Sequence, residues 1–330
     1  RRQRQMCIRD RGYGLWLNHL RSFGMKIAYA FRRSTVYPFV NNGYGAWVLP
    51  SEPALTSFFR KVRGVGYDGI ELGYEVFGGD DASEDSVKEL KKILDDGGAP
   101  CVAIRAGGVL STPIEGQKNL EKLLKSVHIA EWLGVNVVNT ALSGPSRNRI
   151  LGENTPGKPI QQGSSQLANY GDFERTAECL RNAGHVAGES GSVLTVEVHQ
   201  HSIADNSGST LNLLDMVDSD HVYANPDLGN ILWHYDEPEA SCEDAILALA
   251  SRSRYWHCKS LQRVHVPELD RSFFIRVPLP DGDIDYRFAI NTMLDAGYDG
   301  YLALEGTNTG DHLSKDNRSV QYGRDILTEM

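Results

Sequence analysis

The segment Gly66-Tyr-Asp-Gly-Ile-Glu-Leu72 recurs near the other end of the chain as Gly297-Tyr-Asp-Gly-Tyr-Leu-Ala-Leu-Glu305. Each copy combines a glycine suited to a helix end, a tight turn and a short apolar strand. The two copies indicate one structural unit that was used at least twice. A fold assembled from equivalent strand and helix units is typical of a parallel (β/α) barrel.

Short apolar runs separated by amphipathic segments continue through the chain between these two copies. Residues 120–130 carry apolar side chains at helical spacing, and residues 288–294 carry a similar stripe. The runs are continuous and often β-branched, as expected for strands that are buried on both faces. The predicted strands are residues 26–31, 69–72, 101–105, 135–140, 193–199, 222–225, 255–259 and 301–305.

Eight such alternations predict a single (β/α)8 TIM barrel. The alternative is an open, doubly wound sheet, which usually carries a GxGxxG motif after its first strand. The residues after the first predicted strand are instead Arg32-Arg33-Ser34-Thr35. The longest predicted loops, 142–166 and 260–284, follow strands and should lie at the carboxyl ends of the barrel strands, where barrel enzymes bind substrate.

The first residues differ from the rest of the chain. Residues 1–11, RRQRQMCIRDR, are basic and aperiodic and resemble a translated library adapter. A basic targeting arm is the alternative, but no apolar segment or cleavage site follows. We expect residues 1–24 to be a non-native or disordered extension, residues 25–330 to be the barrel domain, and Met25 to be a plausible natural start.

The bulk composition excludes several classes of function. The formal net charge is −9 and the pI is about 5.6, so the chain lacks the basic footprint of a nucleic-acid-binding protein. The sequence contains no run of about twenty apolar residues, so it does not predict a membrane span. The five cysteines are scattered, which argues against a disulfide framework or a structural zinc site and favours reduced thiols in the cytoplasm.

A potential metal ligand ends each of the last four predicted strands. Glu197, Asp227, His257 and Glu305 are separated by 30, 30 and 48 residues (227−197, 257−227, 305−257). Each alone has an ordinary structural explanation, such as a salt bridge or a turn cap. The four residues nevertheless lie at equivalent heights on neighbouring parallel strands, so their side chains should converge on one point near the barrel axis. Three carboxylates and one imidazole favour Mn²⁺, with Mg²⁺ or Co²⁺ as alternatives and Zn²⁺ less suited.

From Met25 to Leu327 the sequence resembles the sugar phosphate isomerase/epimerase family of xylose isomerase-like barrels. The resemblance is carried by the repeated segment already quoted and by these further motifs: Glu197-Val-His199, Asn225-Pro-Asp-Leu-Gly-Asn230, His257-Cys-Lys259 and Gly282-Asp-Ile-Asp285. It implies that Glu197, Asp227, His257 and Glu305 bind a metal ion, and that the two glutamates often also act as the acid and base. Asn230 departs from the family, because several sugar epimerases have histidine there; His199 and His201 are candidates to replace it.

The expected chemistry is proton abstraction next to the carbonyl of a sugar-like substrate, through a metal-stabilised enediolate. Glu197 and Glu305 are the base and acid candidates, and His199 either orients a hydroxyl or is an alternative base. Lys259 should point inward by strand alternation, where it either binds an oxyanion or forms a salt bridge to Asp227 or Glu305. Arg105 either faces the pocket or forms an ion pair inside the barrel.

Several outcomes remain open at this point. The same site serves isomerisation, epimerisation or loss of a β-substituent, and relatives include keto-inositol dehydratases and the catalytic subunits of C-glycoside deglycosidases, which work with a small partner subunit. A homo-oligomer is also compatible with the sequence. An abasic-site endonuclease would need more ligands on the first strands and a basic face, and the intact ligand set argues against a non-catalytic sugar-binding barrel.

Overall fold

The computed structural model describes residues 24–30, 51–145, 165–233, 241–269, 271–307 and 311–329. The expected extension, residues 1–24, lies outside this part of the chain except for Gly24, as does most of the long loop predicted at 142–166. Among the described residues no helix is long and apolar enough to cross a membrane.

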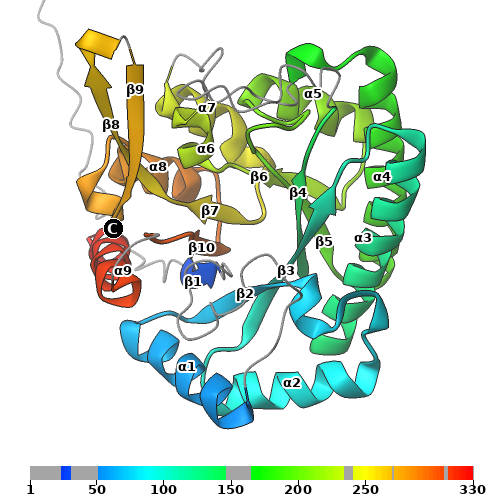
Figure 1. Ribbon diagram of the computed structural model, residues 1–330, viewed down its shortest axis with the longest axis horizontal. Coiled ribbons are helices and arrows are strands. Elements are labelled where there is room, and N and C mark those ends of the chain that lie inside the picture. Colours follow the sequence, from blue (N-terminus) through cyan, green and yellow to red (C-terminus); the bar gives the residue numbers. More distant parts are fainter. Residues whose placement is uncertain are drawn as a thin grey trace, which may run out of the picture.

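Eight of the described strands run parallel in a nearly closed barrel, as predicted (Figure 1). Their order around the sheet is β6-β5-β4-β3-β2-β1-β10-β7. Between β6 and β7 the ring is completed by a single parallel bridge, Ala224 to Ser253. The strands are β1 (Lys26–Ala30), β2 (Gly69–Gly73), β3 (Cys101–Gly108), β4 (Val137–Leu142), β5 (Val193–Glu197), β6 (Val222–Asn225), β7 (Trp256–Cys258) and β10 (Tyr301–Leu304).

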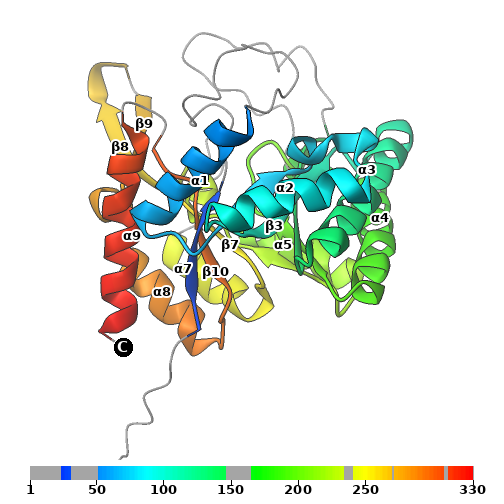
Figure 2. The same cartoon turned by 90° about the horizontal axis from the view of Figure 1, so that it is seen from below.

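Helices cover the outside of the barrel (Figures 1 and 2). Most present an apolar stripe to the strands; in α3, for example, Leu123 and Val127 are fully buried. The repeated segment behaves as predicted, because α1 ends before Gly66 and α8 ends before Gly297, both with positive φ. The helices are α1 (Glu52–Val65), α2 (Glu84–Asp96), α3 (Pro113–Leu133), α4 (Tyr170–Glu189), α5 (Ser207–Val217), α6 (Leu228–Leu232), α7 (Cys242–Leu249), α8 (Tyr286–Asp295) and α9 (His312–Thr328).

The barrel strands alternate between two buried clusters. Ile27 and Tyr29 of β1 belong to the large cluster shared with the helices, whereas Ala28 and Ala30 belong to a small cluster with Ala103 and other strand residues. This period of two is the one expected for strands with both faces buried.

The prediction of a loop at 260–284 is wrong. Residues in this range form an antiparallel hairpin, β8 (Ser260–Val266) and β9 (Arg271–Val277), at the end of the barrel that holds the carboxyl ends of the strands (Figure 2). The hairpin was missed because it is half-exposed and carries charged side chains on both strands, so it lacks the continuous apolar run of a barrel strand.

Candidate metal centre

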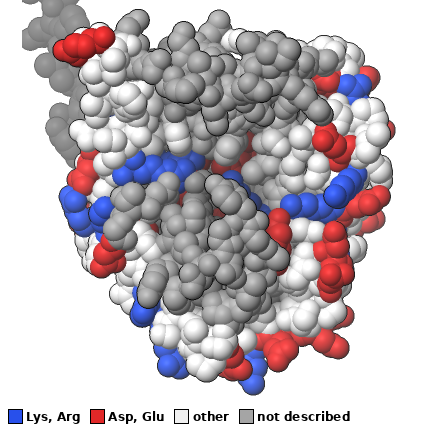
Figure 3. Space-filling view, viewed as in Figure 1, with Lys and Arg blue, Asp and Glu red and all other residues white. Residues whose placement is uncertain are grey.

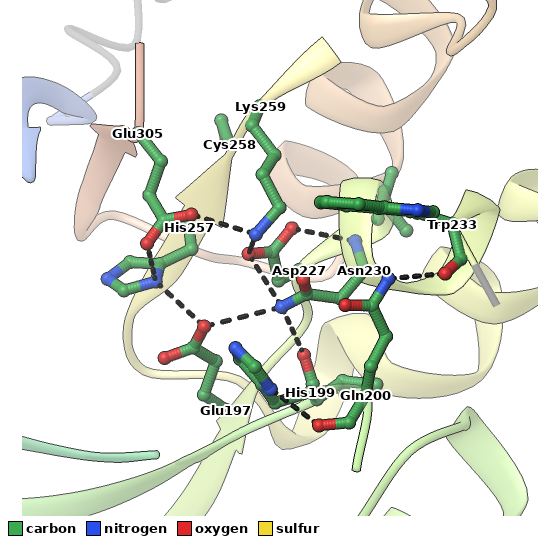
Figure 4. A network of polar contacts seen from close by, with 12 residues as sticks. Glu197, His199, Gln200, Asp227, Asn230, Trp233, His257, Cys258, Lys259 and Glu305 are labelled. Atoms are coloured by element: carbon green, nitrogen blue, oxygen red, sulfur yellow. Dashed lines mark hydrogen bonds and ion pairs between the residues drawn. The ribbon is translucent and has the colours of Figure 1, made fainter. Parts of the chain in front are cut away.

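The four predicted ligands meet at the carboxyl end of the barrel (Figure 4). Glu197 ends β5, Asp227 is the N-cap of α6, His257 lies in β7, and Glu305 follows β10. Each offers a ligand atom, and these atoms all lie within 4.8 Å of one another. All four side chains are at most 1% exposed. Buried carboxylates this close repel one another, so the arrangement fits a cation.

The orientation of His257 supports this interpretation. Its Nε2 lies 2.6 Å from the Glu71 carboxylate, and its backbone N–H donates to Asn225 Oδ1 at 2.6 Å. Its Nδ1 has no hydrogen-bond partner among the described residues and faces Glu197 Oε1 at 3.5 Å and Glu305 Oε1 at 3.7 Å. A carboxylate that accepts the Nε2 proton leaves Nδ1 as a lone-pair donor, the arrangement common at metal-binding histidines.

Two basic side chains neutralise part of this negative charge. Arg105 on β3 lies 3.1 Å from Glu197 Oε2 and 3.5 Å from Glu305 Oε1. Lys259 points inward, and its Nζ lies 2.7 Å from Asp227 Oδ2 and 2.8 Å from Glu305 Oε2. Both residues therefore form the ion pairs that the sequence left as one of two alternatives, and both also border the site.

Burial and neighbouring charges set the protonation of the quartet. Burial alone would raise the pKa of Glu197, but Arg105 and His257 outweigh it and hold the pKa well below its usual value. For Asp227 burial dominates and raises the pKa in spite of Lys259. Burial would lower the pKa of His257, yet Glu71 and Glu197 together raise it to about 10. Glu197 is therefore kept ionised, whereas burial favours the protonated form of Asp227.

Two asparagine side chains hold the ligand carboxylates in place. Asn230 donates from Nδ2 to Asp227 Oδ2 at 3.0 Å, to the Val198 carbonyl oxygen at 2.9 Å and to Glu197 Oε1 at 3.3 Å. Asn139 donates to the other oxygen of Glu197 at 3.3 Å. Asn230 thus contacts two of the ligand carboxylates, those of Glu197 and Asp227 (Figure 4).

The structure separates the two histidines that follow Glu197. The His199 ring lies beside Glu197, with Nδ1 at 2.6 Å from the Gln200 carbonyl oxygen (Figure 4). Burial lowers the pKa of His199, although Glu197 opposes this effect, so the ring is neutral near pH 7. His201 adopts a φ of 60°, and its carbonyl oxygen accepts a hydrogen bond from the Gly144 N–H. Neither histidine belongs to the four-residue group.

The sequence did not identify Glu71, Asn139 or Arg276 as part of this site. Glu71 could have been noticed as a charged residue within the apolar strand Ile70-Glu71-Leu72, but its partner His257 lies 186 residues away. Arg276 comes from the hairpin that was predicted as a loop, and its Nη2 lies 4.0 Å from Glu305 Oε2.

Comparison with known proteins decides the family. The family model described as xylose isomerase-like TIM barrel matches residues 59–330. The chain belongs to this family. The resemblance stated from the motifs is therefore confirmed, and the solved structures that resemble the chain include sugar epimerases.

Individual relatives of the xylose isomerase-like family differ in their chemistry. The chain is 30% identical over 159 residues to an inosose dehydratase of Clostridium perfringens, a match that covers 44% of this chain and 51% of the relative. The match thus spans about half the length of that curated relative. A xylose isomerase-like TIM barrel protein from Mycobacterium smegmatis, solved in complex with magnesium, has a TM-score of 0.72 at 21% identity and covers 92% of this chain and 97% of its own. An L-ribulose 3-epimerase has a TM-score of 0.66 at 17% identity, with coverage of 92% and 95%.

Proposed function

We propose that this protein is a divalent-metal-dependent isomerase or epimerase that abstracts a proton next to the carbonyl of a hydroxylated, sugar-like substrate. The observation that supports this most directly is the buried quartet, in which the free Nδ1 of His257 faces one oxygen of each of two glutamates. A TIM barrel places such groups at the carboxyl ends of its strands, where substrate can reach them.

Glu197, Asp227, His257 and Glu305 would hold the cation. Three oxygen donors and one nitrogen donor suit Mn²⁺ best, with Mg²⁺ and Co²⁺ as alternatives and Zn²⁺ less favoured. A cation bound there would act as a Lewis acid that polarises the substrate carbonyl and makes the neighbouring C–H more acidic.

The two glutamates are the proposed proton carriers. Glu197 is kept ionised by Arg105 and His257, so it is suited to remove a proton from carbon. Glu305 approaches the same point from the other side of His257 Nδ1 and would return the proton. Return to the opposite face of the same carbon gives epimerisation, and return to the neighbouring carbon, with proton transfer between the oxygens, gives isomerisation. His199, neutral and beside Glu197, would orient a substrate hydroxyl.

A lyase is the second candidate, because the chain resembles an inosose dehydratase over about half of the length of that relative. Loss of water starts from the same proton abstraction and ends when the β-hydroxyl leaves instead of the proton returning. The leaving hydroxyl needs a proton donor, and Glu305 or His199 would supply it. The scattered cysteines, of which Cys101, Cys179 and Cys258 are free thiols, fit the cytoplasmic location that we propose for either enzyme.

Solvent exchange in D₂O tests the proposal. Manganese-loaded protein should incorporate deuterium next to the carbonyl of ketoses such as fructose or ribulose, whereas a dehydratase should give a conjugated enone from keto-inositol. Glu197→Gln and Glu305→Gln should each abolish exchange. Glu75→Gln is the matched control, since Glu75 is half-exposed, pairs with Lys122 and lies outside the quartet. Failure of the wild-type protein to bind a divalent cation stoichiometrically would overturn the proposal.

A further inference from the structure

Hairpin β8–β9 carries an arginine into the metal centre. Arg276 lies on β9 opposite Leu261 of β8, which is fully buried, and the Arg276 side chain is only 10% exposed. Its Nη1 donates to the carbonyl oxygen of Glu305 at 3.5 Å, and its Nη2 lies 4.0 Å from Glu305 Oε2. The hairpin, which lies outside the barrel sheet, therefore places the guanidinium group of Arg276 at the edge of the quartet.

The two oxygens of Glu305 have different surroundings. Oε1 faces Arg105 at 3.5 Å and His257 Nδ1 at 3.7 Å, whereas Oε2 faces Lys259 at 2.8 Å and Arg276 at 4.0 Å. Lys259 and Arg276 thus share the side of Glu305 that is turned away from the free nitrogen of the histidine. A substrate group bound by these two cations would not compete for the position between the ligand atoms.

The charges of the described site become unbalanced when a divalent cation is added. In the metal-loaded state His257 is neutral, because a ligand nitrogen must lose its proton, so four carboxylates and three basic side chains together with a divalent cation leave a surplus of one positive charge among the described groups. A buried charge without a counter-charge is costly, so a ligand with one negative charge fits better than a neutral one. The groups counted are Glu71, Glu197, Asp227 and Glu305 against Arg105, Lys259 and Arg276.

The hairpin also contributes one ring to an aromatic pair. Strand alternation puts Phe274 on the face of Arg276, and the Phe274 ring lies 6.4 Å from that of Trp233. Trp233 follows the helix that Asp227 begins, and it lies on the Lys259 side of the network (Figure 4). The two rings can cover the apolar face of a small ring or carbon chain that carries the acidic group.

We propose that Arg276, together with Lys259, binds a carboxylate of the substrate, so that the site binds hydroxylated acids in preference to neutral sugars. This inference rests on the proposed function. A planar guanidinium matches a carboxylate with two parallel hydrogen bonds, and a single surplus charge suits a carboxylate better than a phosphate dianion. Lys and Arg side chains gather on this face between the hairpin and the centre of the barrel (Figure 3).

Calorimetric binding of a matched ligand pair tests the proposal on the manganese-loaded protein. Quinate and its methyl ester share one hydroxylated ring and differ in the negative charge. The wild type should bind quinate about tenfold or more tightly than the ester, since a charge-assisted hydrogen bond contributes that much. Arg276→Gln should reduce the preference to about twofold or less, through weaker binding of quinate and with unchanged affinity for the ester.

The control variant is Arg252→Gln. Arg252 precedes β7 at the opposite end of the barrel and pairs with Asp215 at 2.9 Å, so its loss changes the net charge equally but should keep the preference for quinate. Equal binding of the two ligands by the wild type, binding of neither, or a preference that survives in Arg276→Gln would overturn the inference. The inference would also be overturned if the wild type preferred fructose 6-phosphate to fructose but did not prefer quinate to its ester. If the protein prefers quinate to the ester but shows no deuterium exchange, the proposed function is refuted and the inference about Arg276 stands.

Discussion

Binding of a divalent cation should release a proton from His257 near pH 7.5, and Glu71→Gln should reduce that release. Burial would lower the pKa of His257, but Glu71 and Glu197 raise it to about 10. At pH 7.5 the imidazole of the metal-free protein therefore carries both protons. Coordination through Nδ1 requires one of them to leave, because only the free lone pair binds a cation.

The size of the effect follows from the distance between this pKa and the working pH. A pKa of about 10 at pH 7.5 is a gap of about 2.5 units, which corresponds to roughly 3 kcal/mol of competition between proton and cation. The apparent affinity for the cation should therefore rise with pH. It should increase by about tenfold per pH unit between about pH 7 and 9 and level off near the pKa of His257. Glu71 is the first of the charges that raise the pKa, so its neutralisation should flatten this slope.

Isothermal titration with MnCl₂ at pH 7.5 in Tris and in Pipes measures the released protons, because the two buffers have different ionisation enthalpies. We expect about one proton for the wild type and clearly less for Glu71→Gln. Glu75→Gln makes the same chemical change at a half-exposed site on the short helix after β2 and should match the wild type. No proton release by the wild type, or equal release by Glu71→Gln, would refute this account of the histidine.

Three further changes test the support around the quartet. Asn230→Leu removes the amide that holds Glu197 Oε1, and should weaken manganese binding by about tenfold or more in a titration. Asp316, whose pKa burial raises to about 7, holds its proton more tightly in the folded state; its contribution to stability is present below about pH 4 and lost as the pH rises through 7. Urea unfolding at pH 5 and pH 8 should therefore show that Asp316→Asn becomes more stable relative to the wild type as the pH rises, by up to about 3 kcal/mol. Gly306→Ala should lower the free energy of unfolding by about 2 kcal/mol or more, because its Cβ would lie 2.1 Å from Asp316 Oδ2, whereas Gly64→Ala, with open space in a helix, should raise it by about 0.5–1 kcal/mol.

The sequence was sufficient for the barrel and for the composition of the quartet, because both depend on patterns along the chain. Buried parallel strands are continuous apolar runs, and a polar residue at the end of such a run is conspicuous, as Glu197 and Glu305 are. The parallel arrangement then brings the strand ends together without any knowledge of distances.

The parts that were missed depend on contacts across the barrel. Glu71 and His257 pair across the barrel interior, and no local pattern links them. The hairpin was taken for a loop because its strands pack on one face only: Phe273 and Ile275 are about half exposed, while Arg276 turns inward. Which face an alternating strand presents to a site is set by register, and register is fixed only in three dimensions.

The two glutamates of the quartet divide their oxygens in a way that explains how one residue can serve two roles. Glu197 directs Oε1 to His257 Nδ1 at 3.5 Å and Oε2 to Arg105 at 3.1 Å. Glu305 directs Oε1 to the same nitrogen and Oε2 to Lys259 at 2.8 Å. In each case one oxygen faces His257 Nδ1, while the other makes the closer contact with a basic side chain; Arg105 also lies 3.5 Å from Glu305 Oε1. The positive charges hold both carboxylates in place before a cation binds, so little reorganisation is needed. In the mechanism that we propose, a glutamate held in this way would bind the cation through one oxygen and exchange a proton with substrate through the other.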